Sequence, residues 1–214
     1  MVRPKYFLPS EFKISASYKK ALEEDYQTFI LEPEQHIKNR YGIDVSSFYG
    51  PLKIKNPFGK ASGQLSTNAM QVKSDIEGGL GFTVLKTVIA EGADQKSEME
   101  AWKIKAPKMV IEKITSQSGY DGYTVTWKGR GWEKSLAEYL DFMDESLALD
   151  SSYPIIPSCK YHLPKPGEEY RKEEYTYTTQ KILDVWKKHR KSYLVLEKDF
   201  SATLAGTKQG SEKE

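Results

Sequence analysis

The sequence has few of the residues on which disulfide, zinc and membrane architectures depend. It contains one cysteine, Cys159, and three histidines, so an internal disulfide is excluded and a zinc cluster is not expected. No stretch approaches the run of about 18 apolar residues that a transmembrane helix needs. The N-terminal stretch MVRPKYFLPSEFK also has no apolar segment typical of a signal peptide. We therefore expect a cytoplasmic protein.

The chain also lacks a strong excess of either charge. It has 32 Lys and Arg against 30 Asp and Glu, for a net charge of +2. Proteins that bind nucleic acid or anionic membranes usually have a basic excess, so we expect neither partner. What it does have is 38% hydrophobic and 29% charged residues, a globular composition. Its length suits a single core, although two small domains are possible.

Residues 1–50 are predicted to form a helical extension. Tyr18, Leu22, Tyr26 and Phe29 recur at steps of four, four and three, which is one face of a helix. Pro33 is expected to stop that helix. A second short helix is predicted over 34–41, ending at Gly42, a residue type favoured after a helix.

From residue 51 onward, strand patterns alternate with helix patterns. Strands are predicted in PLKIKNPF (51–58), FTVLKTV (82–88), YPIIPSCKY (153–161) and YLVLEKD (193–199). Helices are predicted after Ser66, which can cap the first of them, and over 131–149 and 169–189. Between the second strand and the second of these helices, KMVIEKI and YTVTWK predict a small β excursion.

Strands that alternate with amphipathic helices imply parallel pairing through right-handed crossovers. A complete (β/α)8 barrel needs about 250 residues, and only four such strands are predicted here. We therefore predict an α/β fold, the N-terminal half of a (β/α)8 TIM barrel, over residues 51–206. It would follow the helical extension and precede a polar tail at 207–214. A complete small α/β domain is the alternative.

Two motifs on successive predicted strands resemble a known family. NPFGKASG (56–63) and GGLGFTVLKTV (78–88) are similar to the opening of the dihydroorotate dehydrogenase-like FMN barrels. In that family a small-residue loop lies under the flavin, and a lysine at the end of the second strand contacts the flavin ring. The resemblance implies cofactor-binding roles for the loop residues and for the end of the strand: Ala61, Ser62, Gly63, Lys86 and Thr87.

The stretch LEKDFSATLAG (196–206) resembles the family's loop after the fourth strand, which carries the catalytic base. The resemblance implies that Ser201 is this base. Lys198 and Thr203 fall where the family has asparagines that hold flavin and substrate, and we take Lys198 as a second catalytic candidate and Thr203 as a substrate contact. The family's Asn-Ser-Met-Gly-like substrate loop would fall near TWKGRGW (126–132) and is absent, so dihydroorotate is not the implied substrate.

The chemistry of the individual residues leaves alternatives open. Small side chains at 61–63 let the backbone approach a flat ring, but an ordinary strand-to-helix turn has the same composition. Lys86 could stabilise an anionic reduced flavin or extend from the rim into water. Ser201 needs a neighbouring group to take its proton, and a structural loop serine is the alternative.

Three further residues are candidates. Lys160, in SCKYHLPKPG after the third predicted strand, could contact the cofactor or another anionic group, or simply be solvated. Trp127 and Lys128 could bind an anionic or aromatic substrate, or pack the excursion onto the barrel rim. Cys159 is expected to be a small buried residue rather than a nucleophile.

The resemblance implies an FMN-dependent oxidoreductase that transfers hydride between the flavin and a small cyclic or unsaturated substrate. The family's second half, which holds the FMN phosphate, is missing from the sequence, so we expect a second polypeptide to complete the barrel. The alternative is a non-catalytic subunit or interaction module that keeps the half-barrel as a scaffold. No metal is expected.

Overall fold

The computed structural model describes residues 15–99, 108–128, 131–164, 166–167 and 169–202. The chain divides into two compact units, Met1–Ser47 and Phe48–Glu214. In the first unit, α1 (Ala16–Phe29) and α2 (Pro33–Tyr41) form the predicted helix pair. Gly42 ends α2 in the left-handed conformation, with φ of 67°, which glycine adopts without steric cost. Both helices and the stop at Gly42 are confirmed.

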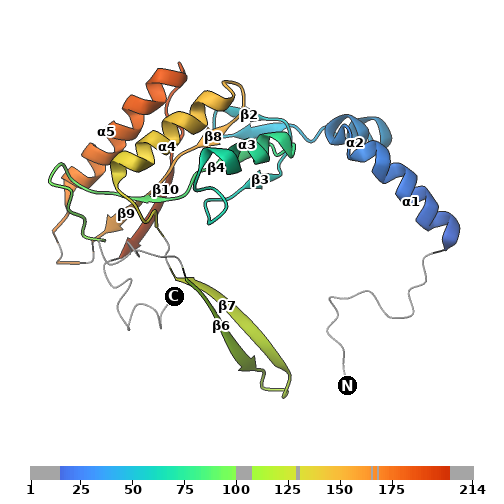
Figure 1. The fold of residues 1–214 in the computed structure, drawn as a ribbon, viewed down its shortest axis with the longest axis horizontal. Helices are drawn as coiled ribbons and strands as arrows, with labels where there is room; N and C mark the ends of the chain where they lie inside the picture. The colour runs from blue at the N-terminus through green and yellow to red at the C-terminus, as the bar shows by residue number, and fades with distance from the viewer. Residues whose placement is uncertain (1–14, 100–107, 129–130, 165, 168, 203–214) are drawn as a thin grey trace. The chain divides into compact units, whose positions relative to one another are not determined.

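The second unit contains parallel strands in two three-stranded groups (Figure 1). One group has the order β3 (Gly59–Lys60), β4 (Phe82–Val84), β8 (Ile155–Ile156), and the other β5 (Val88–Ile89), β9 (Ser158–Leu163), β10 (Glu197–Ala202). Because β5 continues from β4 and β9 from β8, the neighbours follow one another in chain order. The backbone bond from Leu85 N to Ile156 O (2.8 Å) extends the β4–β8 pairing by one residue beyond the end of β4.

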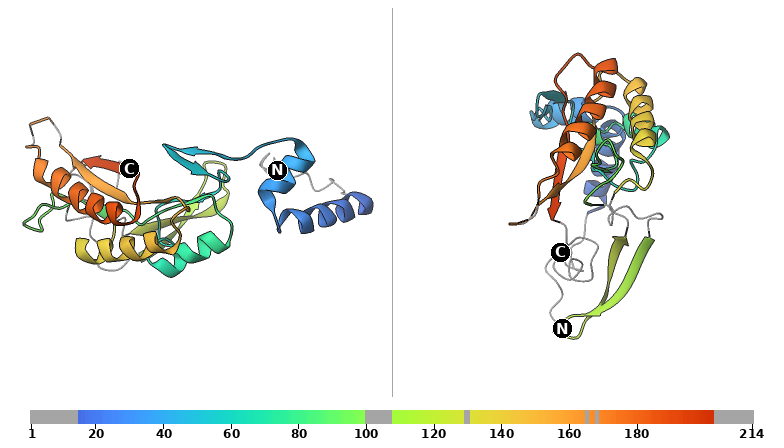
Figure 2. Two further views of the ribbon diagram at one scale, coloured as in Figure 1. Left: turned by 90° about the horizontal axis from the view of Figure 1, so that it is seen from above. Right: turned by 90° about the vertical axis from the view of Figure 1, so that its left-hand side faces the viewer.

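Three helices cover one face of these strands (Figure 2). They are α3 (Ala69–Glu77), α4 (Leu136–Leu149) and α5 (Lys172–His189). The main core lies between this face and the helices, and it includes Leu85, Ile155, Tyr139 and Trp186, all at most 1% exposed. The mixed α/β class and the parallel pairing are as predicted from the alternation of strands and helices.

The boundaries of several elements differ from the prediction. The stretch PLKIK forms β2 (Leu52–Ile54), which pairs with β1 (Ser47–Tyr49) in a separate sheet, so β3 is the strand beside β4. Asn68, not Ser66, caps α3, because its side chain accepts the amide of Gln71. Similarly, α4 begins after Ser135, whose side chain forms a reciprocal capping box with Glu138.

The last strand also begins later than predicted. Residues 193–196 are not a strand, and β10 starts at Glu197, where its backbone amide bonds Pro157 O at 3.0 Å. Leu194, Val195 and Leu196 instead pack against the core. Their apolar character reflects burial rather than strand pairing. The strand was therefore wrongly predicted to begin at residue 193.

The predicted excursion is an antiparallel hairpin of β6 (Lys108–Thr115) and β7 (Asp121–Lys128). Its turn contains Gly119 at φ 80°, a conformation that favours glycine. Within the described ranges, no helix is long and apolar enough to cross a membrane.

Candidate functional site

The loop between β3 and α3 is closed on itself by one buried serine. The Ser66 hydroxyl accepts the Gly63 amide at 3.1 Å and lies 3.2 Å from the Gly63 carbonyl, to which it donates. The Ser66 carbonyl accepts the backbone amide of Lys86 at 2.8 Å. The small-residue loop is therefore hydrogen-bonded to the segment that follows β4. This bond brings together the two sequence motifs at 56–63 and 78–88.

Lys86 is buried where β4 ends, with only 5% of its surface exposed. Its ammonium makes no hydrogen bond or ion pair to any other residue in the described ranges. Burial lowers the pKa of Lys86 below its usual range, and the charge of Lys160 adds to this, while Glu133 opposes it. Glu133 therefore acts on Lys86 as a counter-charge without forming a direct ion pair, and a lysine in this setting favours a further anionic neighbour.

A chain of side-chain hydrogen bonds crosses the sheet beside Lys86. Ser62 Oγ lies 2.5 Å from Thr87 Oγ1, which lies 3.0 Å from Ser158 Oγ. Ser158 in turn donates to Glu197 Oε1 at 2.9 Å. We name Ser62, Thr87, Ser158 and Glu197 the hydroxyl chain, and it links the loop after β3 to β10 through both intervening strands.

Tyr139 of α4 fixes the middle of the hydroxyl chain. Its hydroxyl donates to the Ser158 carbonyl and accepts the Ser158 amide, each at 3.2 Å. Burial raises the pKa of Tyr139 well above its usual range, so the phenol stays protonated and able to donate. The backbone of Ser158 is thereby held at the break between β8 and β9.

Lys160 lies on the same side of β9 as Ser158, since alternate residues of a strand share a face. It is 5% exposed, and its Nζ lies 2.7 Å from Asp199 Oδ2 on β10. His162, 3% exposed, follows on this face and is in register with Ser201. The predicted candidates Lys86, Thr87 and Lys160 are thus buried polar groups near one another.

Lys198 lies on the other face of β10. Its ammonium is 5.9 Å from the centre of the Tyr161 ring, a cation–π contact. Tyr161 belongs to the helix-side core, and its hydroxyl bonds Thr179 of α5 at 2.7 Å. The structure therefore does not bring Lys198 together with Lys86 and Lys160.

The remaining predicted residues are placed only in part. Ala61 is exposed, and Ser62 and Gly63 are half-buried. Trp127 and Lys128 belong to β7, in register with Met109 and Lys108, but their side chains lie outside the described part of the structure, as does that of Ser201. Thr203 lies outside the described residues altogether.

On the helix side, one carboxylate ties the site's strands to α3. Asp75 of α3 forms an ion pair with Lys60 Nζ at 2.7 Å, and it accepts the Thr83 hydroxyl at 2.9 Å. Thr83 Oγ1 lies 3.0 Å from the hydroxyl of Tyr153. This network fixes α3 to β3, to β4 and to the segment that leads into β8.

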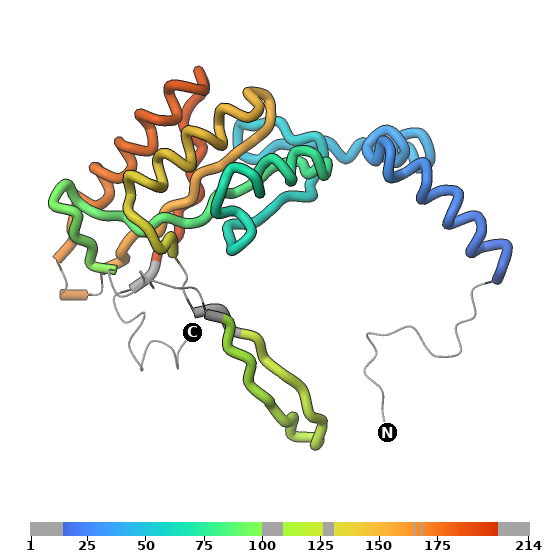
Figure 3. The backbone as a smooth tube through the Cα atoms, in the orientation of Figure 1, coloured from blue at the N-terminus to red at the C-terminus, as the bar shows by residue number. Residues whose placement is uncertain are grey.

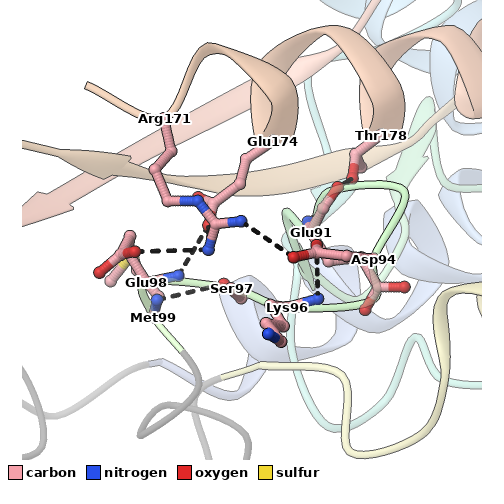
Figure 4. Close-up of polar contacts among 9 residues, drawn as sticks. All are labelled: Glu91, Asp94, Lys96, Ser97, Glu98, Met99, Arg171, Glu174 and Thr178. Atoms are coloured by element: carbon pink, nitrogen blue, oxygen red, sulfur yellow. Dashed lines mark hydrogen bonds and ion pairs between the residues drawn. The ribbon is translucent and has the colours of Figure 1, made fainter. Parts of the chain in front are cut away.

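The segment after β5 is bonded to the N-terminal end of α5, beside which it runs (Figures 3 and 4). Glu174 Oε1 accepts the Glu98 amide at 2.7 Å, and the Thr178 hydroxyl bonds both the amide and the carbonyl of Glu91, at 2.9 and 2.8 Å. Arg171 pairs with Glu98 at 3.3 Å. Despite these acidic residues, the described ranges contain no group of three or more His, Cys, Asp or Glu residues placed to hold a metal ion.

Glu174 is itself fully buried, and its Oε2 has no hydrogen-bond partner in the described ranges. Burial raises the pKa of this carboxyl above its usual range. Cys159 is also buried, as predicted, and burial raises the pKa of its thiol to about 12. A thiol with that pKa is not a nucleophile at neutral pH.

Sequence reasoning missed Ser158, Glu197 and Asp199 as parts of this site. Their partners lie far away along the chain, because Thr87 and Ser158 are 71 positions apart and Ser158 and Glu197 are 39 positions apart. The one available signal was the presence of polar residues in otherwise apolar strands, because buried polar groups need partners.

No protein-family model matches this chain, and no curated protein matches it significantly. Any functional assignment therefore depends on the geometry of the site and on the motif resemblance.

Proposed function

We propose that this chain is the N-terminal half of an FMN-binding (β/α)8 barrel of the dihydroorotate dehydrogenase-like type, acting in an FMN-dependent oxidoreductase. The arrangement of the strands supports this proposal. β3, β4 with β5, β8 with β9, and β10 are parallel neighbours in chain order, with helices on one face. That succession is the one found in half of such a barrel.

The buried side chain of Lys86 is the observation that carries the proposal. The ammonium has no direct hydrogen-bond or ion-pair partner among the described residues, and the backbone amide of Lys86 bonds the Ser66 carbonyl of the loop that contains Ala61, Ser62 and Gly63. When bound, FMN would supply the isoalloxazine ring that accepts and donates hydride. The donor set fits that ring, since the Lys86 ammonium and the backbone amides of Ala61 and Ser62 can meet its polar edge, whereas the Gly63 amide is held by Ser66.

The candidate residues would have different roles in binding FMN. Lys86 would stabilise negative charge on the reduced ring. Gly63 leaves room on its side, because a Cβ there would meet only the Ala61 carbonyl at 3.7 Å. Lys160, balanced by Asp199, would contribute less net charge than Lys86. Ser201 as base, and Trp127, Lys128 and Thr203 as substrate contacts, remain part of the proposal.

The free edge of β10 supports the proposal of a further polypeptide. Within the described residues, β10 pairs only with β9. An unpaired strand edge is prone to aggregation unless it is covered. We propose that polypeptide outside these residues supplies strands five to eight together with the grip on the FMN phosphate.

Flavin binding tests the proposal. The protein, purified with whatever accompanies it, is titrated with FMN and monitored by visible absorbance and fluorescence quenching. Lys86→Ala should weaken FMN binding by roughly 10- to 100-fold, the value of a hydrogen bond to a charged group. Lys73→Ala, on the exposed side of α3, is the matched control and should bind normally. A colourless protein that rejects FMN would overturn the proposal and favour a scaffold role.

A further inference from the structure

The hydroxyl chain has a direction, and the chemistry of its last member sets it. An ionised carboxylate can only accept hydrogen bonds, so the Ser158 hydroxyl donates to Glu197, 2.9 Å away. A hydroxyl has one proton to donate. Ser158 must therefore accept from Thr87, and Thr87 must accept from Ser62.

This direction determines what Ser62 can offer a ligand. Its single proton is directed at Thr87, so its oxygen can only accept a hydrogen bond from outside. Ser62 is half-buried, whereas Thr87 and Ser158 are 7% and 0% exposed. The hydroxyl chain thus begins at a half-buried residue and continues through two buried ones, which water cannot easily reach.

We propose that the hydroxyl chain is a proton relay, in which Glu197 is the terminal acceptor for a proton released by a ligand whose N–H or O–H group lies at Ser62. The ligand's N–H or O–H bond breaks as Ser62 Oγ takes its proton. The proton of Ser62 passes to Thr87, that of Thr87 to Ser158, and that of Ser158 to Glu197 Oε1. The ligand becomes an anion, Glu197 becomes a neutral acid, and no electrons leave either group.

The completed transfer reverses every bond of the chain. Glu197 now donates to Ser158, and Ser62 donates to the ligand anion that it has created. Lys86, whose backbone amide is fastened to the same loop, supplies a positive charge near that anion. The relay deepens the proposed function by naming the group that holds the proton, and it rests on that function only for the identity of the ligand.

Two phenols lie close enough to Glu197 to feel its charge, Tyr49 of β1 and Tyr139 of α4. Burial, together with the Glu197 charge, raises the pKa of both phenols, so both stay neutral in acid. Lys160 and Asp199 lie further along the same face and are paired with each other, and Asp199 therefore serves as the control carboxyl.

The test uses the full chain without ligand. In protein labelled with ¹³C, the side-chain signal of Glu197 and the Cβ signals of Ser62, Thr87 and Ser158 are followed from pH 7 to acid. We expect one shared midpoint at all four residues, because protonation of Glu197 reverses the chain. In Thr87→Val, the Ser158 signal should still change with pH at this midpoint, whereas the Ser62 signal should no longer change. Thr87→Ser should restore the change at Ser62. Asp199→Asn should leave the shared midpoint in place.

Two outcomes would overturn the relay: a Ser62 signal that stays flat in the unmodified protein, or one that still follows Glu197 in Thr87→Val. If Thr87→Val does not fold, Ser158→Ala breaks the chain one step later and should isolate both Thr87 and Ser62 from Glu197. A protein that shows the shared midpoint but rejects FMN would refute the cofactor and leave the relay standing. FMN binding without a shared midpoint would refute the relay and leave the cofactor proposal standing.

Discussion

The ammonium of Lys160 lies 2.7 Å from the carboxylate of Asp199, and the two residues are register partners on β9 and β10. The lysine side chain is 7% exposed and the aspartate side chain 43%. Asp199 therefore balances a buried cation from a position that water can reach. The pair also joins the two strands through side chains on the face that carries the hydroxyl chain.

Asp199→Asn should destabilise the protein by about 1–2 kcal/mol, because it leaves the buried Lys160 charge less compensated. The cost falls below that of a fully buried pair since Asp199 is partly solvated. Urea denaturation measures the free energy of unfolding. In a Lys160→Met background the same substitution should cost much less. An equal cost in both backgrounds would show that the ion pair is not the cause.

Lys86→Met should stabilise the protein at neutral pH, by on the order of 1 kcal/mol, because it removes a buried charge without a matched partner. The sign follows from the lowered pKa of Lys86. The penalty for burying the charged amine is fully present below the folded-state pKa. It falls as pH rises through the folded-state pKa and is gone only above the unfolded value of 10.5, where the amine is neutral in both states.

Thermal unfolding of Lys86→Met and of the unmodified protein between pH 7 and pH 10 measures this difference. The advantage of the variant should shrink as pH rises. An advantage that grows with pH would contradict the burial account. Lys73→Met on α3, whose lysine side chain is 54% exposed, provides the control and should show no such trend.

Tyr139→Phe should cost about 1–3 kcal/mol, since it leaves the buried Ser158 amide without the phenol oxygen that it bonds at 3.2 Å. Chemical denaturation gives the cost, and amide hydrogen exchange at Ser158 should accelerate. Tyr193→Phe, at a side chain that is 91% exposed, should have no effect on either measurement. Unchanged exchange at Ser158 would mean that the phenol does not hold the break between β8 and β9.

Gly81→Ala should be strongly destabilising, by more than about 2 kcal/mol. A Cβ at this position would lie 1.9 Å from the Asn56 carbonyl oxygen, which is backbone and cannot rotate away. Gly122→Ala in β7, where the nearest atom would be 3.8 Å away, is the matched control. Comparable melting temperatures for the two variants would contradict the close approach of residues 56 and 81.

The sequence was sufficient to predict the class of fold and some of the buried polar residues of the site, namely Lys86, Thr87 and Lys160. Alternating strand and helix patterns predicted the parallel pairing, and the motif resemblance selected Lys86 and Thr87 at the end of a strand, where both are buried. Both signals are local, because each depends on neighbours along the chain. The polar partners that cross the sheet, Ser158 and Glu197, have no local periodicity and became visible only through the register of β9 and β10.

The position of Lys198 shows that a motif alignment can be wrong by a single residue. Side chains alternate along a strand, so a shift of one residue moves a side chain to the opposite face. The motif alignment selected Lys198, whereas its neighbours Glu197 and Asp199 face Ser158 and Lys160. Alignment by motif alone could not decide between adjacent residues, but the strand pairing does.

The loop that contains Ala61, Ser62 and Gly63 is anchored at both ends. Lys60 is held by Asp75 on one side, and the Ser66 carbonyl is held by the Lys86 amide on the other. Ordering a loop costs conformational entropy, and here folding meets that cost before any ligand arrives. A molecule that binds against this loop therefore meets a surface already in its final shape, so little of its binding free energy is lost to immobilising the backbone.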